Sequence, residues 1–251
     1  MDRDADTQNK HKESAEKNDA DGTSHLIHFD NVTKQYTQDS IALEEVTFTI
    51  TPQEFVSIVG HSGAGKTTLL KMVLAEEAPS SGKVLFEDTN VHDLHRHEIN
   101  YYRRRIGMVF QDFRLLSHKT AFENIAFAME VAGRPEDEIE SDVPHALDLV
   151  DLGDKIWNFP QELSGGEKQR LAIARAIVNQ PDVVIADEPT GNLDPINTYE
   201  VIEILQKINE LDTTVILSTH DKGIIDDLEH RVVTLENGRV VRDDAHGRYV
   251  L

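Results

Sequence analysis

Gly60-His61-Ser62-Gly63-Ala64-Gly65-Lys66-Thr67 is the stretch of this sequence that decides the fold, and it follows the apolar run Phe55–Val59. It matches G-x-x-x-x-G-K-[ST], the pattern of a phosphate-binding loop between a strand and a helix, and Thr68 to Ala75 supply the helix-forming run. The glycines let the backbone curl so that successive N–H groups point at phosphate oxygens, which the positive end of the helix also attracts. Lys66 supplies a charge for the β- and γ-phosphates, and the Thr67 hydroxyl can bind Mg²⁺. The stretch therefore predicts a nucleoside triphosphate site rather than an ordinary glycine-rich turn.

A pair of acids follows a second apolar run, since Asp187 and Glu188 come directly after Val183–Ala186. A continuous apolar run is typical of a strand buried in a parallel sheet. Phosphoryl transfer to water needs a metal and a group that orients or deprotonates the attacking water. We expect Asp187 to reach Mg²⁺ directly or through water, and Glu188, pointing the other way, to be the base. A salt-bridged strand end is the less favoured alternative, because burying an unpaired carboxylate is costly.

Two more polar residues end predicted strands. His220 follows the run Thr213–Thr219, and Gln111 follows Ile106–Phe110. Parallel strands bring their carboxyl ends to one edge of the sheet, where nucleotides bind. A histidine at that edge can hydrogen-bond the γ-phosphate and hold the water, although a structural histidine fits the sequence equally well. An amide at Gln111 can contact both Mg²⁺ and the attacking water.

The segment between these strands has a helical pattern. Residues 120–132 carry apolar side chains at helical spacing, and residues 135–151 carry seven acids and no Lys or Arg. Ser164 and Glu167 fit a capping box that opens a helix running to Asn179. We therefore expect a helical subdomain inserted into an α/β core, whose strand–helix alternation predicts a mainly parallel sheet with helices on both faces.

Leu163-Ser164-Gly165-Gly166-Glu167 is a second helix N-terminus that contains glycine, and hence a second candidate anion site. It belongs to the helical subdomain and is expected to lie apart from the phosphate loop of its own chain. A head-to-tail dimer with twofold symmetry would resolve this separation, since the second site of each chain would close over the γ-phosphate held by the other.

The composition limits the class of protein. The chain has 251 residues, a net charge of −21 and no cysteine. The charge argues against a nucleic-acid surface, and the lack of cysteine excludes disulfides and thiolate metal sites and suits a cytoplasmic protein. Residues 1–24 hold no Ile, Leu, Val or Phe. They predict a disordered acidic tail, with a helix formed on a partner as the alternative.

A basic, aromatic segment stands out in this acidic chain. His92 to Arg105 is a helix candidate that ends in Tyr101-Tyr102-Arg103-Arg104-Arg105. Contact with acidic lipid headgroups or nucleic acid is one interpretation, but in so acidic a protein we favour a solvated helical face. The histidines at 92, 95 and 97 have no accompanying carboxylate or cysteine pattern, so we expect surface residues rather than metal ligands.

Together these residues resemble the ATP-binding cassette (ABC) ATPase family. Its five motifs occur in the family's order, at Gly60–Thr67, Gln111, Leu163–Glu167, Val183–Glu188 and His220. The resemblance implies an α/β P-loop NTPase fold in residues 25–251. That fold has a mainly parallel core sheet, an antiparallel β subdomain and an α-helical subdomain inserted at about residues 113–179. It also implies hydrolysis of ATP with Mg²⁺ by a homodimer that holds ATP at its interface.

The resemblance also implies a role for each matching position. Tyr36 would stack on adenine, and Asp194, at the end of the Gly191–Asp194 loop, would cross the dimer interface. Ser164, Gly165 and Gly166 would act on the ATP of the other chain. Thr67, Gln111 and Asp187 would hold Mg²⁺, while Glu188, His220 and Gln111 would carry the catalysis. The phosphates would be bound by Gly60, His61, Ser62, Gly63, Ala64, Gly65, Lys66, Thr67 and Thr68.

A closer resemblance, to the bacterial cell-division ATPases of this family, lies in Arg103–Leu116 and Ala186–Asp194. It implies an FtsX-like four-span membrane partner, control of septal peptidoglycan hydrolases, and a location on the inner face of the plasma membrane. The partner would dock in the groove near Gln111–Leu116, where Asp112 and Arg114 offer polar contacts and Phe113, Leu115 and Leu116 apolar ones.

Two alternatives remain. ATPase subunits of lipoprotein-release and macrolide-efflux transporters share the Asp187–Asp194 stretch, so a transport role is the alternative to division. A soluble ABC ATPase acting on DNA or ribosomes is disfavoured. Such proteins typically carry a long coiled-coil insertion or a second cassette, and an acidic protein binds phosphate backbones poorly. We therefore expect no nucleic-acid partner.

Overall fold

The structure is a computed structural model that describes residues 25–37 and 40–247, so the predicted acidic tail lies outside the described residues. Within them a six-stranded sheet has the order β10-β9-β3-β8-β7-β6. Its strands run parallel except in the β9–β10 hairpin, as the predicted mainly parallel core requires. These strands are β3 (Phe55–Val59), β6 (Ile106–Phe110), β7 (Val183–Asp187), β8 (Thr214–Thr219), β9 (Arg231–Glu236) and β10 (Arg239–Asp244).

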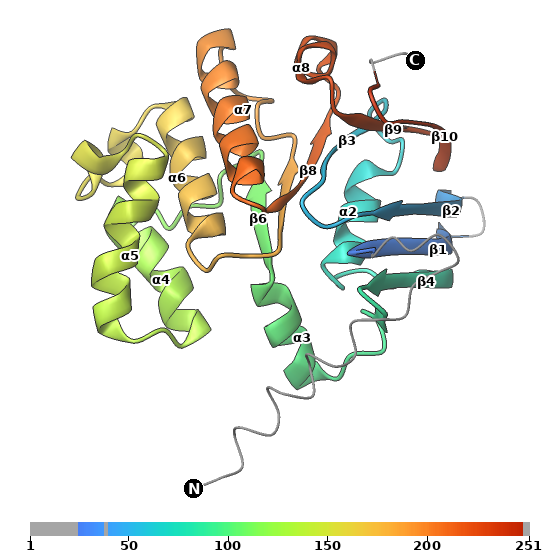
Figure 1. The fold of residues 1–251 in the computed structure, drawn as a ribbon, viewed down its shortest axis with the longest axis horizontal. Coiled ribbons are helices and arrows are strands. Elements are labelled where there is room, and N and C mark those ends of the chain that lie inside the picture. Colours follow the sequence, from blue (N-terminus) through green and yellow to red (C-terminus); the bar gives the residue numbers. More distant parts are fainter. Residues whose placement is uncertain (1–24, 38–39, 248–251) are drawn as a thin grey trace, which may run out of the picture.

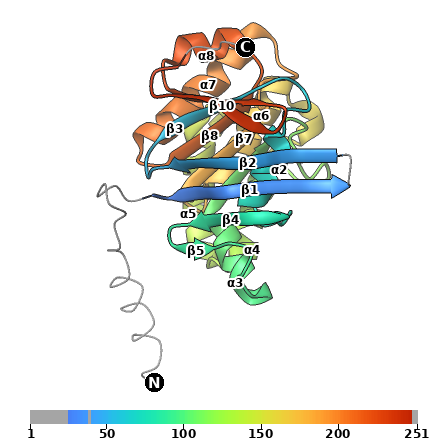
Figure 2. The ribbon, with the colours of Figure 1, turned by 90° about the vertical axis from the view of Figure 1, so that its right-hand side faces the viewer.

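A second, antiparallel sheet of four strands has the order β2-β1-β4-β5. Figure 2 shows its three longer strands side by side across one face of the molecule. The first strand continues through Tyr36, because β2 pairs with it as far as Thr37. The strands are β1 (Ile27–Thr37), β2 (Ser40–Ile50), β4 (Ser81–Phe86) and β5 (Thr89–Asn90).

Helices cover both faces of the parallel sheet. Helix α2 contacts β7 of the parallel sheet and β2 and β4 of the antiparallel one. On the other side α4, α5 and α6 pack against one another, and Figure 1 shows them as a block opposite the antiparallel sheet. The helices are α2 (Lys66–Val73), α3 (Arg96–Arg104), α4 (Ala121–Ala132), α5 (Glu136–Leu149), α6 (Gly165–Ile177), α7 (Pro195–Glu210) and α8 (Lys222–Leu228), with 3-10 turns at Gly153–Lys155 and Pro160–Glu162.

Strand alternation divides the core into two layers. Val183 and Ile185 of β7 join the cluster on the side of α2, whereas Val184 and Ala186 join the cluster on the side of α4, α6 and α7. All four side chains are buried, as expected of a strand covered on both faces. This arrangement puts Asp187, the next residue in the alternation after Ile185, on the side of α2.

The basic helix is shorter than predicted. It begins at Arg96, because the carboxylate of Glu98 accepts from the N–H of His95 at 2.7 Å and caps the helix there. His95 and His97 are exposed, as expected. His92 is half-buried with an unpartnered Nε2, so its prediction as a surface residue is wrong, and burial lowers its pKa. In the described part of the chain, no helix has the length and apolar character needed to cross a bilayer.

Candidate active site

The phosphate loop lies where β3 ends and α2 begins, and one glycine allows its path. Gly65 has a φ of 105°, in the left-handed region that other residues disfavour. A Cβ there would lie only 2.5 Å from the carbonyl oxygen of Ala42 on β2. Lys66 points back into the loop, where its buried ammonium donates to the carbonyl of Gly60 at 2.7 Å. The loop therefore has a closed shape with the lysine ammonium at its centre.

The turn between the last two strands supports this loop. The N–H of Gly238 donates to Ala64 O at 3.2 Å, and Gly238 O accepts from the N–H of Glu44 at 2.8 Å. A Cβ on Gly238 would lie 2.7 Å from Ala42 O, so the missing side chain leaves room for this contact. Three segments far apart in the sequence thus meet at Ala42. The sequence analysis missed the contact, because a turn sequence such as Asn237-Gly238 does not show which distant segment it packs against.

Asp187 and Thr67 form a pair of oxygen ligands at the start of α2. Asp187 Oδ2 accepts a hydrogen bond from Thr67 Oγ1 at 3.2 Å, while Asp187 Oδ1 is buried and has no hydrogen-bond partner. An unpartnered buried carboxylate oxygen costs free energy. A cation that takes oxygen ligands and keeps several waters would satisfy it, so these residues fit Mg²⁺. When bound, Mg²⁺ supplies charge that offsets the phosphate oxygens.

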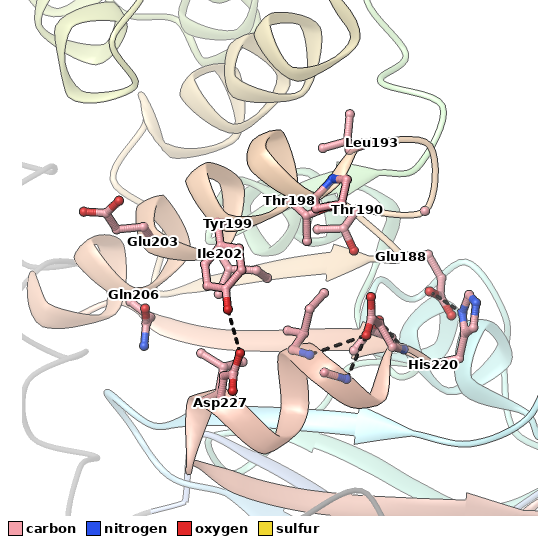
Figure 3. Close-up of a pocket in the computed structure, with 17 residues that line it drawn as sticks. Glu188, Thr190, Leu193, Thr198, Tyr199, Ile202, Glu203, Gln206, His220 and Asp227 are labelled. Carbon is pink, nitrogen blue, oxygen red and sulfur yellow. Dashed lines mark hydrogen bonds and ion pairs between the residues drawn. The ribbon is translucent and has the colours of Figure 1, made fainter.

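Glu188 departs from strand geometry, since its φ is 49°. We expected alternation to turn Glu188 away from Asp187, and this is wrong because the left-handed backbone redirects the side chain. Its Oε2 lies 2.8 Å from His220 Nδ1, the contact drawn in Figure 3. Its Oε1 lies 3.5 Å from the Nζ of Lys66. Both carboxylates therefore face the start of α2, and Glu188 joins the ammonium and the imidazole.

A cavity of about 580 Å³ lies over the loop, within the range of small-molecule sites. Gln111 lines it, and the Gln111 amide packs closely on Gly191, where a Cβ would lie 2.6 Å from Nε2. Tyr36 is not among the lining residues; its ring is half-exposed on β1, with the Lys34 ammonium 5.0 Å from the ring centroid. The described residues that line the cavity are Ala42, the loop residues 61–68, Gln111, Glu188 and His220.

The second anion site begins α6 and stands apart from this cavity, whose lining does not include it. The predicted capping box is confirmed: Ser164 Oγ accepts from Glu167 N at 3.2 Å, and Glu167 accepts from Ser164 N at 2.7 Å. The latter hydrogen bond holds the pKa of Glu167 below its usual value. Ser164 and Gly165 are exposed, so one chain offers the site to solvent.

Asp194, predicted at the dimer interface, caps α7 in this structure. Its Oδ1 accepts from the N–H groups of Ile196 at 3.0 Å and Asn197 at 3.1 Å. The hydrogen bond from Asn197 lowers the pKa of Asp194. A Cβ on Gly166 would collide with Asn197 Oδ1, so the glycine lets α6 and the start of α7 approach closely. The structure thus joins the second anion site to the loop that contains Asp194.

Comparisons with known proteins agree with this geometry. The sequence profile described as ABC transporter matches residues 43–191. The cell division ATP-binding protein FtsE of Bacillus subtilis (strain 168) is 49% identical over 224 residues, which cover 89% of this chain and 98% of that protein. FtsE of Escherichia coli (strain K12) is 44% identical over 215 residues, which cover 86% and 97%.

Among solved structures, a dimeric ATP-binding cassette in a post-hydrolysis state, bound to ADP and Pi, superimposes with a TM-score of 0.79. It shares 34% sequence identity, and the match covers 89% of this chain and all of that one. Profile, relatives and structure agree on the family. The chain belongs to the ABC transporter family and is an ATPase of that family.

Proposed function

We propose that this ATPase hydrolyses ATP as one of two identical subunits of a membrane complex that acts in cell division. The division role is supported by similarity, over nearly the whole of each chain, to proteins named for cell division. The hydrolytic part rests on one observation, the meeting of Lys66, Glu188 and His220 beside the phosphate loop.

Each residue of this cluster has a role that its position supports. Lys66 binds the β- and γ-phosphates, and Thr67 and Asp187 hold Mg²⁺ with help from Gln111. Glu188 accepts the proton of the attacking water, and His220 holds the Glu188 carboxylate in place. In the structure described here Glu188 instead contacts Lys66. When ATP binds, a phosphate therefore has to replace the Glu188 carboxylate as the partner of Lys66.

Two copies are needed because the exposed Ser164 and Gly165 lie apart from the cavity of their own chain. In the proposed homodimer the α6 N-terminus of one copy faces the ATP of the other, and Asp194 lies at the interface. Tyr36 stacks on the adenine. The dimeric state of a structurally similar cassette supports this arrangement.

A groove of about 680 Å³ beside the loop after Gln111 is the proposed site of the membrane partner. Of the described residues that line it, none is Asp or Glu, in a chain whose net charge is −21. Phe127 and Val131 add exposed apolar surface, with exposed fractions of 43% and 61%. The arginines in the lining are Arg103, Arg104, Arg114 and Arg175.

The loop residues of this groove are held from the helical block. Arg175 on α6 donates to the carbonyls of Phe113 at 2.9 Å and Arg114 at 2.6 Å. Both of these loop residues have positive φ, 59° and 48°. Arg114 and Leu116 line the groove, whereas Asp112, Phe113 and Leu115 do not. A partner seated here would touch a loop that continues directly into Gln111.

The partner in this proposal is an FtsX-like four-span membrane protein, through which the ATPase sits on the inner face of the plasma membrane. ATP-driven closure of the dimer would then control septal peptidoglycan hydrolases through that protein. A neighbouring reading frame that encodes a four-span protein with one large extracellular loop supports this role, and a solute-transporting permease opposes it.

Charge reversal at Arg114 tests the groove. We expect Arg114→Glu to lose co-purification with the membrane partner while ATP binding persists, because Arg114 does not line the cavity over the phosphate loop. Arg96→Glu, at the exposed start of α3, is the matched control, and we expect this variant still to co-purify with the membrane partner. If Arg114→Glu still co-purifies with the partner and still responds to it, the groove is not the docking site.

A further inference from the structure

The helical block carries a second groove, which takes no part in the proposed function. It has a volume of about 770 Å³ and lies between α4, α5 and the loop that leads to α6. Figure 1 shows α4 and α5 on the side of the molecule opposite the antiparallel sheet. We call it the α4–α5 groove; its apolar lining includes Phe122, Ala126, Ile139, Ile156 and Trp157.

Trp157 is the most conspicuous residue of the α4–α5 groove. Its side chain is 66% exposed, although its ring stacks on Phe122 with centroids 5.3 Å apart. Ile139 and Ala126 beside it are buried and connect the groove to the core. Tryptophan is enriched in the hot spots of protein-binding sites, and exposed apolar patches mark such sites. An exposed tryptophan in a hollow with an apolar floor therefore indicates a protein-binding site.

The rim of the groove is acidic. Glu130, Glu136 and Glu140 line it and are exposed, and in the described part of the chain their carboxylates make no ion pair. The one base in the lining, Arg134, is already paired with Glu138 and Asp142. The groove therefore combines unneutralised negative charge with the face of a tryptophan, which also attracts cations.

This charge determines the class of ligand. A nucleic acid or an anionic lipid surface would be repelled by the three glutamates. A second copy of this chain is a poor occupant too, because its net charge is −21 and three of the four arginines of its basic segment are hydrogen-bonded, which leaves Arg96. Arg103 bonds to Leu74 O, Arg104 to Val131 O, and Arg105 to Glu87 and Asp182.

We propose that the α4–α5 groove binds a basic amphipathic helix of a partner protein. The apolar face of that helix packs on Trp157, Phe122 and Ile139, and its Lys or Arg side chains reach the glutamates on the rim. Apolar anchors spaced along one face of a helix are the usual way in which helices fill such grooves. The site is separate from the phosphate loop and from the arginine-lined groove, so the inference does not depend on the proposed function.

The test uses the intrinsic fluorescence of Trp157, since the chain has a single tryptophan. The probe is a synthetic helix of leucine and lysine with leucine at i, i+3, i+4 and i+7. We expect its addition to the full chain to shift the emission of Trp157 and to saturate. A peptide of the same composition, scrambled so that no apolar face forms, should leave the emission unchanged.

Variants locate the binding. The triple variant Glu130→Gln/Glu136→Gln/Glu140→Gln should lower the affinity for the peptide about tenfold. Each exposed charge contributes modestly, and the three contributions add. A matched triple on α7 and the turn after it, Glu203→Gln/Glu210→Gln/Asp212→Asn, should keep the affinity. Trp157→Ala, measured by the anisotropy of a fluorescein-labelled peptide, should weaken binding to a similar degree.

ATP turnover without peptide should stay unchanged in every variant, which shows that the chain remains folded. Equal affinity in the two triple variants, or equal binding of the scrambled peptide, would overturn the proposal. Self-association that is lost in Trp157→Ala would also overturn it, since the occupant would then be a second copy.

Discussion

At the residue scale, the most consequential contact is the one that Glu188 makes with Lys66 and His220. The sequence predicted that these side chains belong to one nucleotide site, because Glu188 and His220 each follow a strand and Lys66 lies in the phosphate loop. It did not predict how Glu188 turns, since a positive φ in a residue other than glycine depends on the surrounding fold. The role of Ala42 was equally hidden, because a small apolar residue carries no chemical signal.

Replacing Glu188 by Gln tests its role as the base. We expect turnover to fall by about 10²- to 10⁴-fold, the usual contribution of a general base, while ATP still binds. Phosphate release gives the rate, and size exclusion with ATP and Mg²⁺ should show an accumulated dimer. Glu203→Gln, at an exposed position on α7, is the control. Undiminished turnover in Glu188→Gln would remove this residue from the mechanism.

His230 should make the stability of the protein depend on pH. Its ring stacks on Phe55 with centroids 4.6 Å apart, and burial lowers its pKa below the usual value. The unfolded chain therefore binds a proton at a higher pH than the folded chain. Below a pH of about 6.5 the free energy of unfolding should fall as pH falls, until the folded histidine is protonated as well.

His230→Phe keeps the stacking and removes this titration. Urea unfolding at pH values of about 7.5 and 5.5, on either side of the ordinary histidine pKa, should show a smaller loss of stability in this variant. His97→Phe, at an exposed position, is the control and should lose as much stability between these two pH values as the unchanged protein. An equal loss in the His230→Phe variant would mean that other groups carry the pH dependence.

At the element scale, patterns with a local cause were predicted well. The capping box at Ser164 and the buried strand β7 follow from neighbouring residues alone. The start of α3 was misplaced because the helix begins only where the Glu98 carboxylate caps it. The length of β1 depends on β2, which pairs with it as far as Thr37. Boundaries that depend on a distant partner leave no mark in the local pattern.

Gly107 on β6 shows how closely α6 approaches the parallel sheet. A Cβ there would lie 2.4 Å from the backbone oxygen of Ala176. We expect Gly107→Ala to destabilise the protein by about 1–3 kcal/mol, since a backbone oxygen cannot move aside as a side chain can. Urea unfolding measures this cost. Gly153→Ala is the control, because its Cβ would meet only the flexible carboxylate of Asp148.

A destabilisation of Gly107→Ala no larger than that of Gly153→Ala would show that α6 can shift away from the sheet. In that case the approach of the two elements would be loose, and the helical block would be free to move against the core.

At the scale of the whole molecule, the alternation of strands and helices predicted the α/β class, and the family resemblance added the antiparallel sheet. The order β10-β9-β3-β8-β7-β6 could not be derived from the pattern, because the pattern does not state which strands become neighbours. The candidate site was predicted more completely than the strand order, since the phosphate loop and the strand-end acids are local in sequence. The acid-rimmed groove at Trp157 was not anticipated.

If two chains complete each site, turnover per chain should depend on protein concentration. We expect the rate per chain to rise with concentration and then to level off as dimers form. A dilution series followed by phosphate release measures it, and sedimentation shows the oligomeric state in the same range. A constant rate per chain, in samples where sedimentation finds only monomers, would contradict the shared site.

The contact of Gly238 with Ala42 and Ala64 has a consequence for synthesis on the ribosome. The phosphate loop leaves the ribosome long before the turn that supports it, because Gly238 follows the loop by more than half of the printed sequence. Nascent chains should therefore remain unable to retain ATP until the turn at Gly238 has left the ribosome. Truncation by a premature stop codon before Gly238 would yield products that lack this support, which the cell would recognise as unfolded material and degrade.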